Sequence, residues 1–184
     1  MRSQILNLPS DTVAPLLLGM KLSVKTPEGI IAGFIVETES YDSKDPASHT
    51  FKGPNIRNRS MFMQPGTLYV YLSYGLHNCL NIVCGKSDGQ AVLIRSIEPV
   101  AGIDIMQQRR RQTDLIKLTN GPAKLTQALA ITLSDDGIQI GHKVMLTSGF
   151  EPDKITQTTR VGITKAVNDQ RRYYVTDNPY VSVR

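Results

Sequence analysis

Cysteine is scarce in this sequence, and the two cysteines stand close together. Cys79 and Cys84 are the only ones among 184 residues, and they form no CxxC pair. Together with His77 they match no usual set of zinc ligands, because structural zinc sites need four ligands at recognisable spacings. We therefore expect no metal site here, but buried free thiols in a reducing compartment.

Long apolar runs are also missing. The run at residues 16–18 is too short and its surroundings are too polar for a signal peptide or a membrane span. The chain shows no internal repeat, no low-complexity tract and no obvious linker. Its length suits one domain with a proper core. We therefore expect a single domain over residues 1–184, in the cytosol and without a membrane contact.

The order of the predicted elements indicates the fold class. The sequence predicts strands at residues 21–25, 30–41, 67–72, 77–84, 90–97, 160–165 and 171–176, and helices at about residues 10–19, 100–111 and 122–131. Successive strands joined by short turns imply a mostly antiparallel sheet. The expectation is an α+β fold, a compact domain with a curved antiparallel β-sheet and flanking helices.

Tyrosines are concentrated in one segment, although aromatic residues make up only 6% of the chain. Tyr69 and Tyr71 share one side of a predicted strand, because successive side chains of a strand alternate between its faces. Tyr69 is equally well explained as a core residue. The long polar stretch at residues 42–65 precedes this strand and is expected to be a functional loop.

A tight hairpin should follow the tyrosine-rich strand. Gly75 can supply the positive φ that a three-residue loop needs at its last position, which predicts a loop of Ser73, Tyr74 and Gly75. In this register Tyr71 lies opposite His77. Tyr74 then stands at the exposed tip, where an aromatic side chain needs a functional explanation.

Two acids precede the loop on one predicted strand. Glu37, Glu39 and Tyr41 alternate onto the same face, so spacing alone does not choose between the two carboxylates. Arg95 lies in an aliphatic run, AVLIR, where a charged side chain needs a partner. An arginine at a strand end, with its stem packed and its charge in solvent, is the alternative. The net charge of +5 is compatible with a polyanionic partner without requiring one.

Several ordered motifs resemble one known family. They are VETESY at residues 36–41, NRSMFMQPGTLYVYLSYG at 58–75, AVLIRSIEP at 91–99, GPAKLTQALAI at 121–131 and RYYVTDNPYVSV at 172–183. This pattern resembles the alkyladenine or 3-methyladenine DNA glycosylases of the methylpurine type, which differ from the helix-hairpin-helix glycosylases. The resemblance covers almost the whole chain and implies a compact mixed fold.

The resemblance implies a role for the acid and the arginine. Glu39 matches the carboxylate that deprotonates water and steadies the cationic sugar as the base leaves. Arg95 matches the arginine that accompanies this acid and the water. No lysine stands at the acid's position, so the expected reaction stops at an abasic site without strand cleavage. No cofactor and no catalytic metal are expected.

The resemblance also implies a pocket for an extruded base. Tyr41, His49 and Tyr71 match the residues that stack on the base, and Asn81 matches the residue that rejects the 2-amino group of normal guanine. Tyr74 matches the side chain that fills the vacated stack after the nucleotide has rotated out. His77 departs from the pattern, because relatives often carry an aromatic residue there.

The implied partner is double-stranded DNA that contains damaged purines, bound by a monomer. Arg57 and Arg59 are candidates for phosphate contacts and are preferred to the run at residues 109–111, which could be a solvated helix end. The expected location is the cytoplasm, associated with the nucleoid, in a bacterium, and the nucleus in a eukaryote.

Two other functions remain open at this point. One is a non-catalytic nucleic-acid-binding module related to the tail domain of methionyl-tRNA formyltransferases, for which the combination of Glu39, Tyr74 and Asn81 would have no purpose. The other is a glycosylase of RNA or free nucleosides, which would need no wedge. The sequence does not rank 3-methyladenine, 7-methylguanine, hypoxanthine and ethenoadenine as substrates.

Overall fold

The computed structural model describes residues 2–183 and contains both helices and strands. In chain order the elements are α1 (Arg2–Ile5), α2 (Ser10–Leu16), β1 (Lys21–Thr26), β2 (Gly29–Tyr41), the 3-10 helix η1 (Arg59–Phe62), β3 (Leu68–Ser73), β4 (His77–Cys84), β5 (Gln90–Ala101), α3 (Ile103–Arg110), α4 (Ile116–Thr119), α5 (Pro122–Leu129), the 3-10 helix η2 (Leu133–Asp135), β6 (Val144–Thr147), β7 (Ile155–Thr158) and β8 (Arg172–Val175).

One antiparallel sheet organises the molecule. Its strands follow the order β3-β4-β5-β2-β1-β6, and β8 pairs with both β2 and β7. Strand β2 pairs with β5 along one edge; its other edge pairs with β1 up to Phe34 and with β8 from Glu37 to Glu39. The long strand β2 therefore lies at the centre of the sheet. An antiparallel sheet together with helices confirms the expected α+β class.

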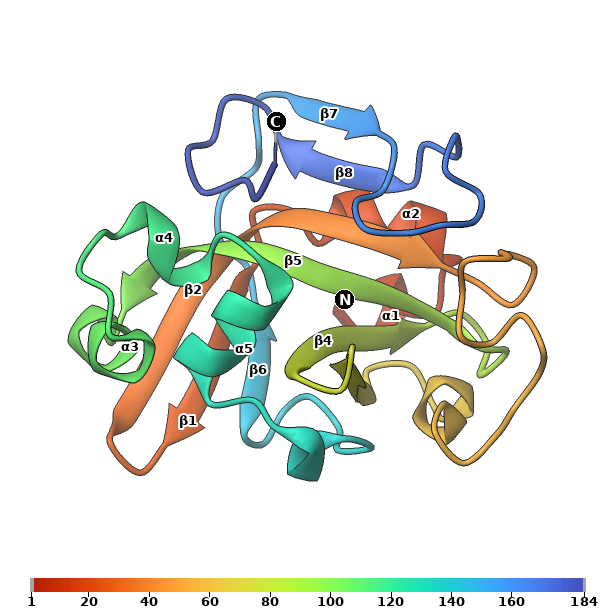
Figure 1. Ribbon diagram of the computed structural model, residues 1–184, viewed down its shortest axis with the longest axis horizontal. Coiled ribbons are helices and arrows are strands. Elements are labelled where there is room, and N and C mark those ends of the chain that lie inside the picture. Colours follow the sequence, from red (N-terminus) through yellow and green to blue (C-terminus); the bar gives the residue numbers. More distant parts are fainter. Residues whose placement is uncertain (1, 184) are drawn as a thin grey trace.

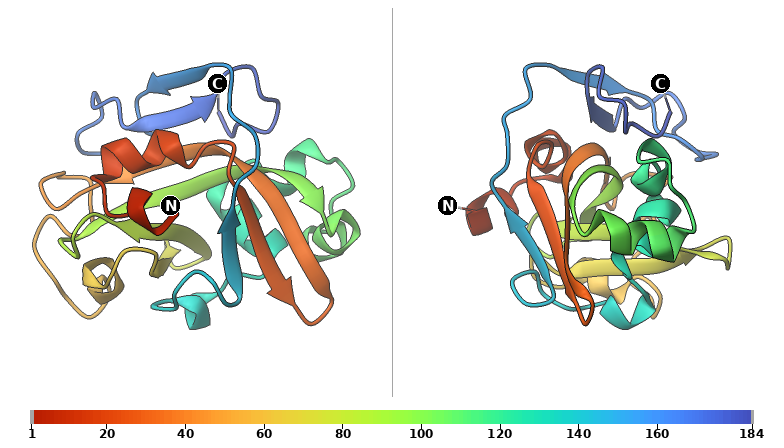
Figure 2. Two further views of the ribbon diagram at one scale, coloured as in Figure 1. Left: turned by 180° about the vertical axis from the view of Figure 1, so that it is seen from behind. Right: turned by 90° about the vertical axis from the view of Figure 1, so that its left-hand side faces the viewer.

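Helices cover both faces of the sheet (Figures 1 and 2). Helix α2 packs on β2 and β5 from one side, whereas α5 packs on β4 and β5 from the other, together with α3 and α4. A strand covered on both faces buries consecutive residues. In β2 this applies to the whole stretch from Ile35 to Ser40, which includes two glutamates. Burial of these acids requires partners inside the protein.

Both cysteines are buried and carry free thiols, as expected. Burial raises the pKa of Cys84, so this thiol stays protonated at neutral pH. Within residues 2–183, no helix is long and apolar enough to cross a membrane.

Some predicted elements differ from the observed ones. The helix predicted at residues 100–111 begins only at Ile103, because β5 continues to Ala101 and Gly102 follows in the left-handed region with φ of 66°. The strand predicted at residues 160–165 is wrong, because these residues form no strand, and β7 supplies the partner of β8 instead. Strand β6 and helix α4 were not predicted.

Candidate active site

The two acids of β2 meet at one arginine. A β-bulge interrupts the pairing of β2 with β5 around Glu37, so strict alternation does not describe this part of the strand. Arg95 reaches both carboxylates from β5, with its Nε 3.2 Å from Glu37 Oε1 and its Nη1 3.2 Å from Glu39 Oε1. The charged residue in the aliphatic run thus has two buried partners.

Glu37 is surrounded by hydrogen-bond donors. Its Oε1 accepts from Arg95 Nε at 3.2 Å, Arg172 Nη1 at 2.7 Å and Ser182 Oγ at 3.0 Å. Its Oε2 accepts from the Ser96 hydroxyl at 3.2 Å and from the Ser182 backbone N–H at 2.8 Å. A carboxylate with five donors has little capacity left for a water. Glu37 therefore holds the sheet and the C-terminal segment together.

Glu39 has fewer partners and lies next to the candidate pocket. Its Oε1 accepts the Val161 backbone N–H at 2.9 Å and pairs with Arg95. Its Oε2 accepts the Tyr41 hydroxyl at 2.8 Å. Burial first, and then the charge of Glu39, raise the pKa of Tyr41, so the phenol remains a donor at neutral pH. The structure thus distinguishes the two acids, which strand spacing alone did not.

A cavity of about 540 Å³ opens beside Tyr41. Its size falls within the range of small-molecule pockets. The structure brings six of the predicted site residues to its wall: Tyr41, His49, Arg57, Tyr71, Tyr74 and Asn81. Glu39 and Arg95 lie behind Tyr41 and do not line the cavity themselves.

Three rings form one wall of this cavity. The Tyr69 and Tyr71 rings stack with centroids 5.4 Å apart, and the His49 ring is nearly perpendicular to the Tyr71 ring, with centroids 4.6 Å apart. The Tyr69 hydroxyl lies 2.8 Å from His49 Nδ1. Tyr69 lines the cavity and orients the histidine in addition to being a core residue. Its position on the same strand face as Tyr71 was the sequence signal for this role.

His49 and Asn81 present polar groups to the cavity. Partial burial of the imidazole, and then the nearby charge of Arg57, lower the pKa of His49 below its ordinary value. The ring is therefore neutral at neutral pH. Asn81 is buried and donates its side-chain N–H to the Tyr69 carbonyl at 3.1 Å, which fixes the orientation of the amide.

Tyr74 stands at the tip of the β3–β4 hairpin and is 87% exposed. Tyr74 and Gly75 both have positive φ, 50° and 70°, and the Leu76 N–H bonds the Ser73 carbonyl at 3.0 Å. This geometry matches a type I′ turn.

The predicted hairpin register is wrong by two residues. Ser73 pairs with His77, and Tyr71 lies opposite Cys79. Because strand faces alternate with a period of two, the shift leaves Tyr71 on its expected side. It also adds Leu76, which is 76% exposed, to the tip.

The basic candidates differ in position. Arg57 donates from Nη2 to the Leu72 carbonyl at 3.2 Å and lies 5.7 Å from the Tyr71 ring centroid, at the cavity. Arg59 is exposed on η1 and does not line the cavity. In the 109–111 run, Arg109 pairs with Glu28 at 2.9 Å and Arg110 donates to the Leu118 carbonyl at 3.1 Å. These two side chains support the fold.

Sequence reasoning missed one part of the cavity wall. Gly162, Ile163, Thr164 and Lys165 line it, and the preceding Val161 bonds Glu39 through its backbone. A contact made by a backbone N–H does not depend on the type of residue, so the sequence does not reveal it. The segment was also expected to be a strand. Among residues 2–183 no group of three or more His, Cys, Asp and Glu side chains is placed to hold a metal.

Comparison with known proteins gives a consistent result. Residues 4–179 match the family model described as "Methylpurine-DNA glycosylase (MPG)". A protein of Methanoculleus marisnigri named "Putative 3-methyladenine DNA glycosylase" is 46% identical, covering 94% of this chain and 93% of its own. Proteins with the same name from Francisella tularensis subsp. tularensis (45% identity, 97% and 96% coverage) and Rubrobacter xylanophilus (46%, 86% and 85%) are similar. The chain belongs to the methylpurine-DNA glycosylase family.

Proposed function

We propose that this protein is a DNA glycosylase that removes damaged purines from duplex DNA by hydrolysis. The observation that carries the proposal is the buried Glu39 carboxylate, paired with Arg95 and held directly behind an aromatic cavity. The relatives' names point to alkylated adenine as one substrate.

Glu39 is the group that acts on water in this proposal. The bond between the sugar C1′ and the base nitrogen breaks, and its electron pair leaves with the base. Glu39 takes a proton from the attacking water, and its charge stabilises the positively charged sugar. Arg95 and the Val161 N–H hold the carboxylate in place. The Tyr41 hydroxyl takes one acceptor site of Oε2, which leaves this oxygen a second site for the attacking water.

The cavity is the proposed receptor for the extruded base. Tyr41, Tyr71 and the neutral His49 offer ring surfaces, and base–aromatic stacking is worth about 1–3 kcal/mol per base. Asn81 disfavours normal guanine by contact with its 2-amino group. Tyr74 fills the space left in the duplex, and Arg57 and Arg59 contact the DNA backbone.

The reaction is proposed to stop at the abasic site. Lys165, at the cavity wall, is the residue that could form a Schiff base with the opened sugar. Borohydride trapping on abasic duplex tests this point, with Lys165→Arg as the control variant. We expect no covalent adduct; a trapped adduct that the variant lacks would assign lyase activity to Lys165.

Base excision from a panel of single-lesion duplexes tests the function itself. Duplexes with 3-methyladenine, 7-methylguanine, hypoxanthine or ethenoadenine are incubated with excess protein, and the released base is measured. We expect release from at least one duplex and none with Glu39→Gln. A module that only reads nucleic-acid shape would bind these duplexes without releasing a base, and release from single strands or RNA alone would indicate a different glycosylase.

A further inference from the structure

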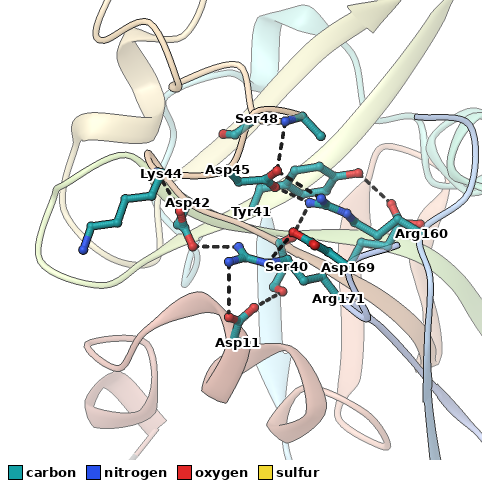
Figure 3. A network of polar contacts seen from close by, with 12 residues as sticks. Asp11, Ser40, Tyr41, Asp42, Lys44, Asp45, Ser48, Arg160, Asp169 and Arg171 are labelled. Carbon is teal, nitrogen blue, oxygen red and sulfur yellow. Dashed lines mark hydrogen bonds and ion pairs between the residues drawn. The ribbon is translucent and has the colours of Figure 1, made fainter. Parts of the chain in front are cut away.

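Arg160 belongs to the segment that follows β7, and its side chain contacts Asp45 in the loop that follows β2. Its guanidinium and the Asp45 carboxylate form a fully buried ion pair through both terminal nitrogens, with Nη2 3.0 Å from Oδ1 (Figure 3). Nη1 also donates to the Ser40 carbonyl at 3.1 Å. Nε has no hydrogen-bond partner among the described residues. The two terminal nitrogens therefore set the plane of the guanidinium.

Asp45 is held firmly on its own side. Its Oδ1 accepts the Ala47 N–H at 2.9 Å, and its carbonyl accepts the Ser48 N–H at 2.9 Å. These bonds form a turn directly before His49, which lines the cavity. The pair thus joins the His49 side of the pocket to the 160–165 side.

The guanidinium lies over the ring of Tyr41. Its Cζ lies 4.6 Å from the ring centroid, and Figure 3 shows Arg160 beside the ring with Asp45 next to it. An aromatic ring has two faces, and arginine is the cation best suited to cover one of them flat. Tyr41 also lines the cavity, so an extruded base would stack on the ring face that Arg160 does not cover.

Arg160 also precedes the residue that contacts the acid. The Val161 N–H donates to Glu39 Oε1, and the Tyr41 hydroxyl donates to Oε2. Fixing Arg160 therefore fixes both donors on Glu39 that do not come from Arg95. A buried ion pair gives little net stability by itself, because desolvation offsets the attraction. Its geometry, by contrast, is specific.

We propose that Arg160 and Asp45 are positioning residues for base excision, which rests on the function proposed above. Through Tyr41 they place the surface on which the base stacks, and through Val161 they place the carboxylate of Glu39. Neither side chain needs to touch DNA.

The test compares two arginine–aspartate pairs. Arg160→Lys keeps the charge but loses the flat contact with Tyr41, and Asp45→Asn removes the charge at nearly constant shape. The control is the pair of Arg171 and Asp42, 2.6 Å apart and partly exposed, which joins the same loop to the C-terminal segment. The Arg171 side chain pairs with Asp42, Asp11 and Asp169 (Figure 3), so Arg171→Lys and Asp42→Asn should leave Tyr41 and Glu39 in place.

Single-turnover excision and duplex binding are measured for all four variants, with thermal unfolding to confirm folding. We expect the excision rate constant to fall about 10- to 100-fold for the Arg160 and Asp45 variants at nearly unchanged affinity, the loss typical of a small misplacement of reacting groups. The control variants should excise like the parent. Equal losses for both pairs, or no loss in either, would overturn the proposal; if Arg160→Lys does not fold, Asp45→Asn decides.

Two further measurements distinguish a positioning role of Arg160 from a general contribution to protein stability. If Arg160 acts through Tyr41, the double variant should lose less transition-state stabilisation than the sum of the losses measured for Arg160→Lys and for Tyr41→Phe. The ring signals of Tyr41 in carbon-13 NMR, assigned with Tyr41→Phe, should shift in Arg160→Lys and not in Arg171→Lys. The NMR result does not depend on activity, so a parent that releases no base would reject the proposed function while the positioning geometry is still tested.

Discussion

Glu37 and Glu39 are chemically identical and differ only in their surroundings. Glu39→Gln should keep the fold and DNA affinity but lose base release, because an amide cannot take a proton from water. Glu37→Gln should instead lower the free energy of unfolding by about 3–5 kcal/mol, since it leaves buried Arg95 and Arg172 short of a counter-charge. Denaturant unfolding and single-turnover excision measure the two effects. A Glu37→Gln variant that releases no base but is as stable as the parent would show that Glu37, and not Glu39, acts on water.

His49 should make stability depend on pH. Its pKa is lower in the folded protein than the ordinary value of about 6.5 that it has when unfolded, so the unfolded chain binds the proton more readily. As the pH falls from about 6.5 through the folded pKa, the free energy of unfolding should therefore decrease. Melting temperatures between pH 7.5 and pH 5 measure this slope. We expect His49→Gln to show less of it; an identical slope in both proteins would contradict this.

The β3–β4 hairpin tip gives a prediction at the scale of an element. Tyr74→Ala and Tyr74→Gly both remove the ring, but only glycine relieves the positive φ of 50°. Tyr74→Gly should therefore be the more stable of the two by about 1 kcal/mol, because the cost of a Cβ in the left-handed region exceeds the extra chain entropy of glycine. Both should excise more slowly from matched duplexes, and less so where the lesion pairs badly with its partner, because less unstacking must be offset.

A fluorescent ethenoadenine in matched and mismatched duplexes measures flipping for these variants by stopped flow. The parent protein and Leu76→Ala are the references, since Leu76 is exposed at the same tip without an aromatic ring. If the Tyr74 variants flip and excise like the parent in every duplex, Tyr74 is not a wedge.

Much of the sheet could be predicted from the sequence. The strands at residues 30–41 and 77–84 were predicted within a residue or two, because their apolar runs end at turn residues. The short strand β6, by contrast, pairs with β1 at the other end of the chain, and β7 pairs with β8 across a long connection without a hairpin signal. Polar and apolar residues alternate at 160–165 as they do in a strand, but the Arg160 side chain bonds Asp45, which lies 115 positions away in the sequence.

The candidate site could be predicted where side-chain identity carries its chemistry. Tyr41, His49, Tyr71 and Asn81 were identified through the family resemblance, and all four line one cavity. The β-bulge at Glu37 and the Val161 N–H were not predictable, because both are features of the backbone in the folded chain. The hairpin register depended on two consecutive positive φ angles, of which only the one at Gly75 had a sequence signal.

At the scale of the whole molecule, the segment that contains Ser182 is bonded to the buried carboxylate of Glu37. A chain that ends at Asp177 would lose both contacts from Ser182, and each buried group left without its partner costs about 1–3 kcal/mol. It should be clearly less stable than a chain that ends at Val183. In a Glu37→Gln background the same truncation should cost less. Urea unfolding measures all four chains, and equal costs in both backgrounds would show that packing, not Glu37, holds this segment.

The acids and their donors are far apart in the sequence, which separates them in time. Glu39 and Val161 are 122 positions apart, a stretch that a ribosome makes in roughly 6–24 s at about 5–20 residues per second. Throughout this interval a nascent chain carries both glutamates without the Val161, Arg172 and Ser182 donors. Glu39 lacks its full set of partners until residue 161 is made, and Glu37 lacks its own until residue 182 is made. The centre that would act on DNA is therefore assembled only after the segment that follows β7 has been made, and a nascent chain that is shorter than this does not possess it.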